Sequence, residues 1–139
     1  MTGRVVMERI QTLIRTGTDF GPLPGDPLQQ TIESDRLDIN LGENDWVTLR
    51  WDPTEESLRW ERAGESWPLL EGVTQQLAGT GESIPPFTLQ FVDGRWLSRA
   101  VINLVVADDI GETLMIERPA PLPTRLIGSA MPRISAWRD

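Results

Sequence analysis

The feature that most constrains the fold is a series of short segments in which hydrophobic and polar residues alternate. Three of these segments follow one another between residues 36 and 62. Their hydrophobic positions are Leu37, Ile39 and Leu41, then Val47, Leu49 and Trp51, then Leu58 and Trp60. A period of two is typical of a β-strand with one buried face. The polar links 42–45 and 52–56 suit turns, so the pattern predicts a three-stranded antiparallel meander.

Alternation returns in the second half of the chain. Phe87, Leu89 and Phe91 share one side of a segment that is followed by the turn dipeptide Asp93-Gly94. The longest alternating face comes next and consists of Ala100, Ile102, Leu104 and Val106. Two further strands are therefore predicted, and we expect a turn at 108–111 to lead into a sixth strand at 113–117.

Proline and glycine mark the segments that should not be regular. The stretch 20–30 holds three prolines and two glycines, which favours an extended connection. The tail 119–139 holds four prolines, so we expect little regular structure there.

The first residues of the chain have a helical period. One face of an α-helix would carry the hydrophobic residues Val6, Ile10, Leu13 and Ile14, with Gly17 at the next position of the same spacing. This spacing predicts a helix over 3–16 that ends at Gly17. Thr2 is the one candidate cap, and Arg4 is unfavourable at a helix N-terminus. The helix is either an ordinary terminal helix or the end of a longer one.

Together these segments predict an α+β fold, in which an N-terminal amphipathic helix packs on one antiparallel β-sheet of about six strands. At 139 residues the chain is expected to form a single domain. Its parts would be the helix at 1–17, a β-rich region at 36–118 and the Pro-rich tail at 119–139.

Composition excludes several kinds of function. The chain has no Cys and no His, so it lacks a thiolate nucleophile, disulfides and the commonest transition-metal ligands. Its net charge is -8, and its 13 basic residues, all Arg, are scattered singly along the sequence. Binding to duplex nucleic acid needs clustered basic residues and is not expected. No apolar run approaches the roughly 18 residues of a membrane helix.

Acidic residues invite two chemical interpretations, neither of which we favour. The clusters at 43–45, 52–56 and 108–109 could offer oxygen ligands to calcium, but they lack the pattern of an EF-hand loop. The second interpretation is a hydrolase using carboxylates such as Glu55, Glu71 or Asp109, yet nothing in the sequence brings a chosen pair together. We therefore expect no enzyme, and no catalytic, cofactor-binding or metal-binding residues.

Six tryptophans are many for a chain of this length. Trp51 and Trp60 alternate with polar residues and are expected in the core. Trp46 lies on the polar side of its segment, so Trp46 and Trp67 are candidates for an interface.

The order of these segments resembles the J-type minor pseudopilins of type II secretion and the W-type minor pilins. The matching stretches are 6–15, 46–62, 68–73 and 93–117. In that family a Leu-Leu-Glu-Gly-Val block, here 69–73, follows a hairpin whose turn reads like Asp52-Pro53-Thr54. The family's N-terminal leader, cleavage site and apolar membrane segment are not in this sequence. The resemblance therefore implies the ectodomain of a pilin-like protein without its membrane helix.

The resemblance also implies a function. The chain would be a structural minor subunit of a type IV pilus, a type II secretion pseudopilus or a DNA-uptake machine, anchored in the inner membrane with its ectodomain outside. Its partners would be other minor pilins or pseudopilins and the major pilin. The candidate interface residues are Val6, Ile10, Leu13, Trp46 and Trp67. The alternative is a small acidic binding or immunity-type module that occludes a basic partner, which the net charge of -8 favours.

Overall fold

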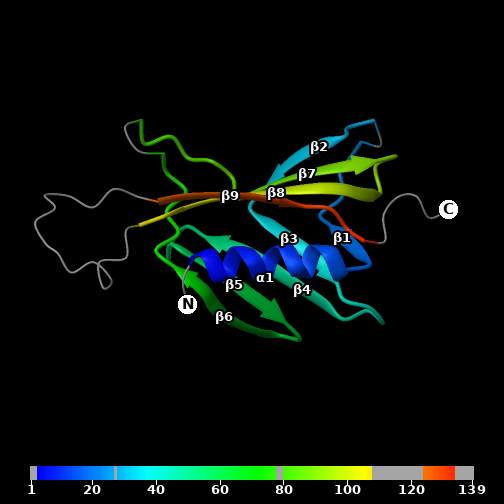
Figure 1. The fold of residues 1–139 in the computed structure, drawn as a ribbon, viewed down its shortest axis with the longest axis horizontal. Helices are drawn as coiled ribbons and strands as arrows, with labels where there is room; N and C mark the ends of the chain where they lie inside the picture. The colour runs from blue at the N-terminus through cyan, green and yellow to red at the C-terminus, as the bar shows by residue number, and fades with distance from the viewer. Residues whose placement is uncertain (1–2, 27, 78–79, 108–123, 134–139) are drawn as a thin grey trace, which may run out of the picture.

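A computed structural model describes residues 3–26, 28–77, 80–107 and 124–133 (Figure 1). These residues form one helix and nine strands. Their bounds are α1 Gly3–Thr16, β1 Asp19–Gly21, β2 Thr31–Ser34, β3 Arg36–Asn40, β4 Trp46–Asp52, β5 Ser57–Arg62, β6 Glu65–Glu71, β7 Phe87–Val92, β8 Trp96–Val106 and β9 Thr124–Ala130. The predicted turn at 108–111 and the predicted strand at 113–117 lie outside the described residues.

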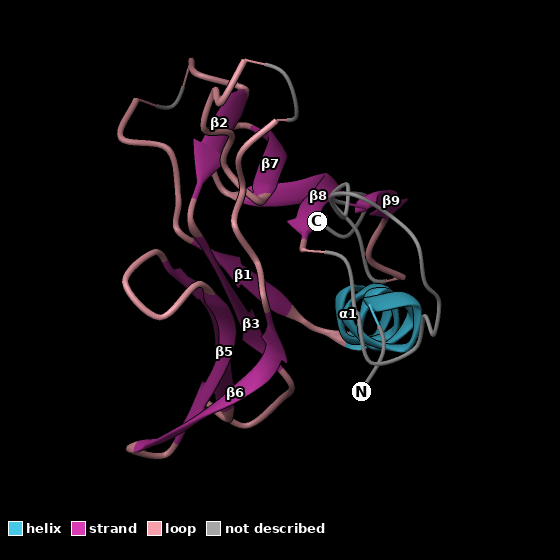
Figure 2. Ribbon diagram, turned by 90° about the vertical axis from the view of Figure 1, so that its left-hand side faces the viewer, coloured by secondary structure: helices cyan, strands magenta, loops and turns pink. Residues whose placement is uncertain are grey.

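The predicted α+β fold, with a helix on one sheet of about six strands, is wrong. The strands form two antiparallel sheets, sheet A in the order β1-β3-β4-β5-β6 and sheet B in the order β2-β7-β8-β9. Figure 2 shows the two sheets meeting at an angle, with α1 lying in the opening between them. The fold is thus mostly β, and α1 closes a two-sheet structure instead of covering one sheet.

Sheet A contains the predicted meander. Strands β3, β4 and β5 pair in sequence, with Leu37 opposite Leu49 and Leu49 opposite Trp60. Leu37 and Leu49 are fully buried, and Trp51 and Trp60 are partly buried against the core, as predicted. Hydrophobic and polar residues alternate in the sequence of these strands because one face is buried and the other is open to solvent. Strand β6 adds an edge that the sequence did not predict.

Sheet B includes a strand from the Pro-rich tail. The prediction of little regular structure over 119–139 is wrong for Thr124–Ala130, which pairs with β8 along seven residues. The register places Leu126, Gly128 and Ala130 opposite inward residues of β8. Two of these three inward positions are too small to produce a visible hydrophobic alternation. The short strands β1 and β2, which precede β3, were also not predicted.

Helix α1 has the predicted bounds, and it is held by burial. A helix of 14 residues is marginal alone in water. Val6, Ile10 and Ile14 are fully buried in the core shared with both sheets, and each such side chain contributes about 1.5–3 kcal/mol. The helix approaches β9 closely at Gly128. A Cβ atom there would lie 2.8 Å from Met7 Sδ and 2.8 Å from Gln11 Nε2.

The Leu-Leu-Glu-Gly-Val block is the crossing between the two sheets. Leu69 and Leu70 are buried at the end of β6. Gly72 has a φ of 78°, in the region that favours glycine, and turns the chain out of sheet A. Val73 then forms an antiparallel bridge with Val106 of β8 in sheet B. Trp51 donates its Nε1–H to the Val73 carbonyl at 2.8 Å, which ties the crossing to sheet A.

Gln75 fixes the crossing to sheet B. Its side chain is fully buried. The side-chain Nε2 donates to the carbonyl oxygens of Asn103 at 2.9 Å and Ile84 at 3.1 Å, and Oε1 accepts from the Val105 amide at 2.9 Å. Strand β7 pairs with β8 only as far as Ile102. The Gln75 amide therefore supplies hydrogen bonds to β8 beyond Ile102, where none of the described strands of sheet B pairs with it on that side.

Replacing Gln75 by Met should lower the free energy of unfolding by about 3 kcal/mol, because two partly buried carbonyls and one buried amide lose their partner. Urea denaturation of both proteins measures the difference. Gln76→Met is the matched control, since Gln76 is exposed, and it should change stability by less than about 0.5 kcal/mol. Equal effects of the two substitutions would contradict the role of Gln75.

Replacing Gly128 by Ala should cost about 1–3 kcal/mol, because the new methyl group would overlap Met7 and Gln11 unless α1 shifts. Thermal unfolding followed by circular dichroism is a suitable measurement. Gly25→Ala is the control, since a Cβ atom there meets no described atom within 4 Å. A Gly128→Ala protein as stable as the Gly25→Ala protein would show that α1 does not pack tightly on β9.

Candidate interaction face on the outer side of sheet A

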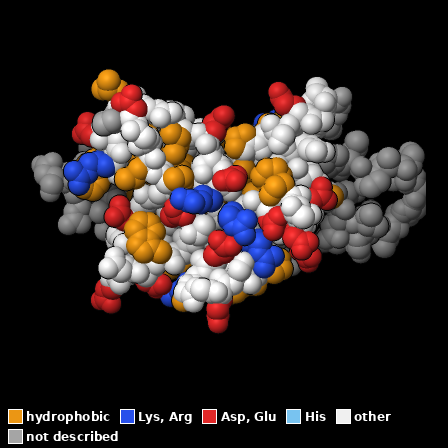
Figure 3. Space-filling view, turned by 180° about the vertical axis from the view of Figure 1, so that it is seen from behind, with side chains coloured by type: hydrophobic (Ala, Val, Ile, Leu, Met, Phe, Trp, Pro, Cys, Tyr) orange, Lys and Arg blue, Asp and Glu red, His pale blue; other side chains and the backbone are white. Residues whose placement is uncertain are grey.

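The side of sheet A turned away from α1, here called the outer face, carries a row of three arginines. The register pairs Arg36 of β3 with Arg50 of β4, and Arg50 with Arg59 of β5. We call these three residues the arginine row. Their side chains alternate with the buried positions of the same strands, so they emerge on the outer face. Figure 3 shows basic side chains crossing the middle of the molecule on this side, with acidic ones beside them.

A second row of polar residues lies beside the arginines, one step of the strand alternation away. Asp38, Thr48 and Glu61 are directly opposite one another on β3, β4 and β5. The Thr48 hydroxyl donates to Asp38 Oδ1 at 2.8 Å. Arg50 donates to Glu61 Oε2 from Nε at 3.1 Å and from Nη2 at 2.8 Å. The centre of the face is therefore held in one geometry.

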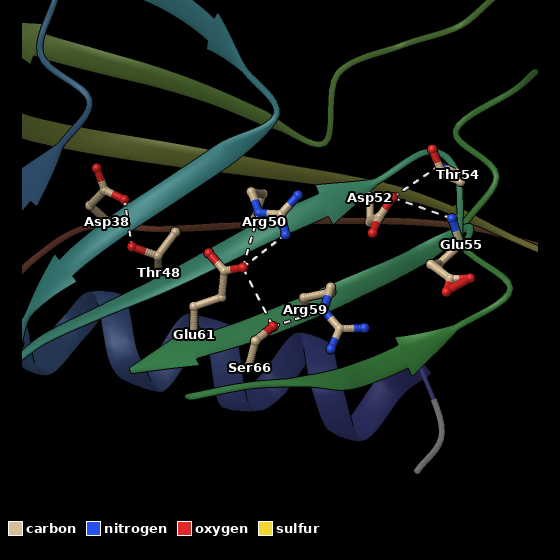
Figure 4. A network of polar contacts seen from close by, with 9 residues as sticks. All are labelled: Asp38, Thr48, Arg50, Asp52, Thr54, Glu55, Arg59, Glu61 and Ser66. Carbon is tan, nitrogen blue, oxygen red and sulfur yellow. Dashed lines mark hydrogen bonds and ion pairs between the residues drawn. The ribbon is translucent and has the colours of Figure 1, made fainter. Parts of the chain in front are cut away.

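Strand β6 extends this network through Ser66. The Ser66 hydroxyl accepts from Arg59 Nε at 2.8 Å and lies 3.4 Å from Glu61 Oε2, to which it donates. Figure 4 shows the chain of contacts from Arg50 through Glu61 and Ser66 to Arg59, with α1 on the far side of the sheet. Asp52, at the end of β4, caps the adjacent turn by accepting from the Thr54 amide.

The pairing of Arg50 with Glu61 shifts the pKa of both side chains. The hydrogen bond from Arg50 lowers the pKa of Glu61 below its usual value, and this effect outweighs the opposing effect of burial. The same hydrogen bond raises the pKa of Arg50. The ion pair is partly open to solvent, with side-chain exposures of 37% for Arg50 and 31% for Glu61. Its contribution to stability is therefore that of a surface pair, about 0.5–1 kcal/mol.

The five predicted interface residues fall into two groups. Val6 and Ile10 are fully buried and Leu13 is partly buried against the core, so these three pack α1 onto its own chain. Trp46 and Trp67 keep 39% and 42% of their surface exposed. Trp46 lies on the outer face, opposite Asn40. Trp67 lies on the edge strand β6, where its ring stacks on Trp60 with centroids 6.0 Å apart.

The described residues include two of the three carboxylates named as candidate catalysts, and neither of the two takes part in an ion pair there. Glu55 lies in the turn between β4 and β5, and Glu71 ends β6. Asp109 and its acidic neighbour Asp108 lie outside the described residues. In the part of the chain that is described, no three acidic side chains come together as a metal site would require. Helix α1, the one helix in that same part of the chain, is not long and apolar enough to cross a membrane.

The arginine row was missed because its members are far apart in the sequence. The signal was present in the turn lengths: the links after Asn40 and after Asp52 fix which residues face each other across the meander. With that register, arginines at three polar positions become neighbours. Comparison of the chain with protein-family models, with curated proteins and with solved structures finds no match.

Replacing Glu61 by Gln should reduce the loss of stability in acid. Because the pKa of Glu61 is lower in the folded chain, its pairing stabilises the protein above the pKa of the unfolded chain. That stabilisation disappears as the pH falls through the folded-state pKa. Between pH 6 and pH 3 the variant should lose about 0.5–1 kcal/mol less than the original protein.

Urea denaturation at several pH values measures this difference. Glu65→Gln, at the exposed start of β6, removes the same charge within the same hairpin and serves as control. Indistinguishable pH profiles for the Glu61→Gln and Glu65→Gln proteins would contradict the assignment.

Proposed function

We propose that this chain is a structural subunit that acts by protein–protein contact, as a minor pilin or pseudopilin of a type IV pilus, a type II secretion pseudopilus or a DNA-uptake machine. The observation that carries the contact role is the ordered polar network on the outer face of sheet A, with Trp46 on the same face. Arg and Trp are the residues most enriched at the energetic centres of protein interfaces.

The form of this face favours a protein partner over a small molecule. Its polar groups lie on four adjacent strands, from Asp38 on β3 to Ser66 on β6. Small-molecule sites are concave and mostly apolar, whereas this is an outward sheet surface with charged side chains. Arg50 and Glu61 are already held by hydrogen bonds, so a partner would not have to order them, which lowers the entropic cost of binding.

The choice of a pilus-like machine rests on the sequence resemblance. The block at 69–73 that contributes to this resemblance is the crossing that joins sheet A to sheet B. On this proposal the partners are other minor pilins or pseudopilins and the major pilin. The protein would belong to the cell envelope, held by an N-terminal membrane helix that precedes the present sequence.

The arrangement of charge argues against the alternative of an acidic module that occludes a basic partner. Such a module would present carboxylates to its partner. The face with the ordered network instead carries three arginines interleaved with Asp38 and Glu61, although the chain as a whole carries a net charge of -8. A contact through this face therefore suits an acidic or mixed surface better than a basic one.

The test is the intact mass and the N-terminal residue of the protein isolated from its source cells, with membrane and soluble fractions separated. We expect a membrane-bound species heavier than the 15.6 kDa of this sequence, with a processed and methylated apolar N-terminus. A species of 15.6 kDa in the soluble fraction, with no envelope association, would overturn the pilin proposal.

A further inference from the structure

The arginine row is electrostatically unfavourable by itself. Neighbouring strands lie about 4.8 Å apart, and like charges directly opposite one another across a sheet destabilise it. Asp38 and Glu61 beside the row offset part of this repulsion, and the buried core does not require any of the three arginines.

The two outer members of the row retain unused hydrogen-bond donors. Among described residues, Arg59 contacts Ser66 through Nε and forms no ion pair. Arg36 Nε lies 3.5 Å from Asp38 Oδ2, an ion pair too long for a strong hydrogen bond. Each guanidinium thus has terminal N–H groups available in a planar fork, the arrangement that binds a carboxylate through two parallel hydrogen bonds.

Arg50, the central member, has fewer free donors than Arg36 and Arg59 because its Nε and Nη2 already donate to Glu61. Arg36 and Arg59 are separated by two strand spacings, about 10 Å. An extended peptide places alternate side chains about 6.7 Å apart on one face, so two or three carboxylates of one acidic segment could reach both arginines. Trp46, 39% exposed on the same face, lies four residues before Arg50 on β4, about 13 Å along the strand, and offers an apolar contact to the continuation of such a segment.

We propose that the arginine row is a receptor for an acidic segment of a partner protein, with Arg36 and Arg59 each binding a carboxylate and Arg50 fixed between them. This inference rests on the proposed contact role of the outer face, but not on the identity of the machine. It assigns the row to binding, because the ion pairs of these partly exposed arginines contribute little to stability.

The experiment uses the whole chain and a fluorescent peptide of four Glu-Thr repeats, with four Gln-Thr repeats as the neutral control peptide. Fluorescence anisotropy at low ionic strength measures binding. The double variant Arg36→Gln and Arg59→Gln should bind the acidic peptide at least roughly tenfold more weakly. Gln at position 59 retains a donor for Ser66, and Arg50 is left in place. The melting temperature should change little, because relief of the repulsion along the row opposes loss of the partly exposed Arg36–Asp38 ion pair.

The matched control is the double variant Arg9→Gln and Arg15→Gln, which removes the same charge from the exposed face of α1. It should bind the acidic peptide within about twofold of the original chain. Absence of binding by the original chain, or equal weakening in both double variants, would overturn the proposal. Binding of tripolyphosphate but not of the acidic peptide would also overturn it, by assigning the row to phosphate groups. None of these outcomes bears on the mass and N-terminus of the native protein.

Discussion

The buried side chain of Gln75 is the contact on which the arrangement of the two sheets depends. Its three hydrogen bonds occupy main-chain groups of Ile84, Asn103 and Val105. Without this amide, β8 would run past the end of β7 with buried polar groups unpaired, which is costly in a protein interior. Because Trp51 holds the same crossing from the other side, one short segment sets the position of sheet A against sheet B.

This arrangement explains why the outer face of sheet A is free to take part in binding. The inner faces of both sheets and the buried side of α1 together supply the core. Position 50 on the outer face is therefore not needed for burial, and a charged network there has little effect on folding. Surface residues that are ordered but not required for the core are the ones that natural proteins can adapt for recognition.

The sequence predicted the elements that bury one face and expose the other. It did not predict the elements whose position depends on tertiary contacts. The meander and the bounds of α1 were predictable, since residues such as Leu49 and Ile10 alternate or repeat with a clear period. Strand β9 was not predictable, because α1 approaches so closely that position 128 has to be glycine, and glycine interrupts the hydrophobic alternation. The division into two sheets depends on the turn at Gly72 and on its distant partners. The exposure of Trp46 was foreseen, whereas the arginine row appears only once the strands are placed in register.

The most direct test of the account is photo-crosslinking in the source cells, with a photoreactive amino acid in place of Trp46. A second protein carries the same group in place of Thr88, which lies on the outer side of sheet B between the buried Phe87 and Leu89. The account predicts specific crosslinks to a neighbouring protein from position 46 and far fewer from position 88. Crosslinks from position 88 alone, or from neither position in cells that contain the protein, would contradict the claim that this chain acts through the outer face of sheet A.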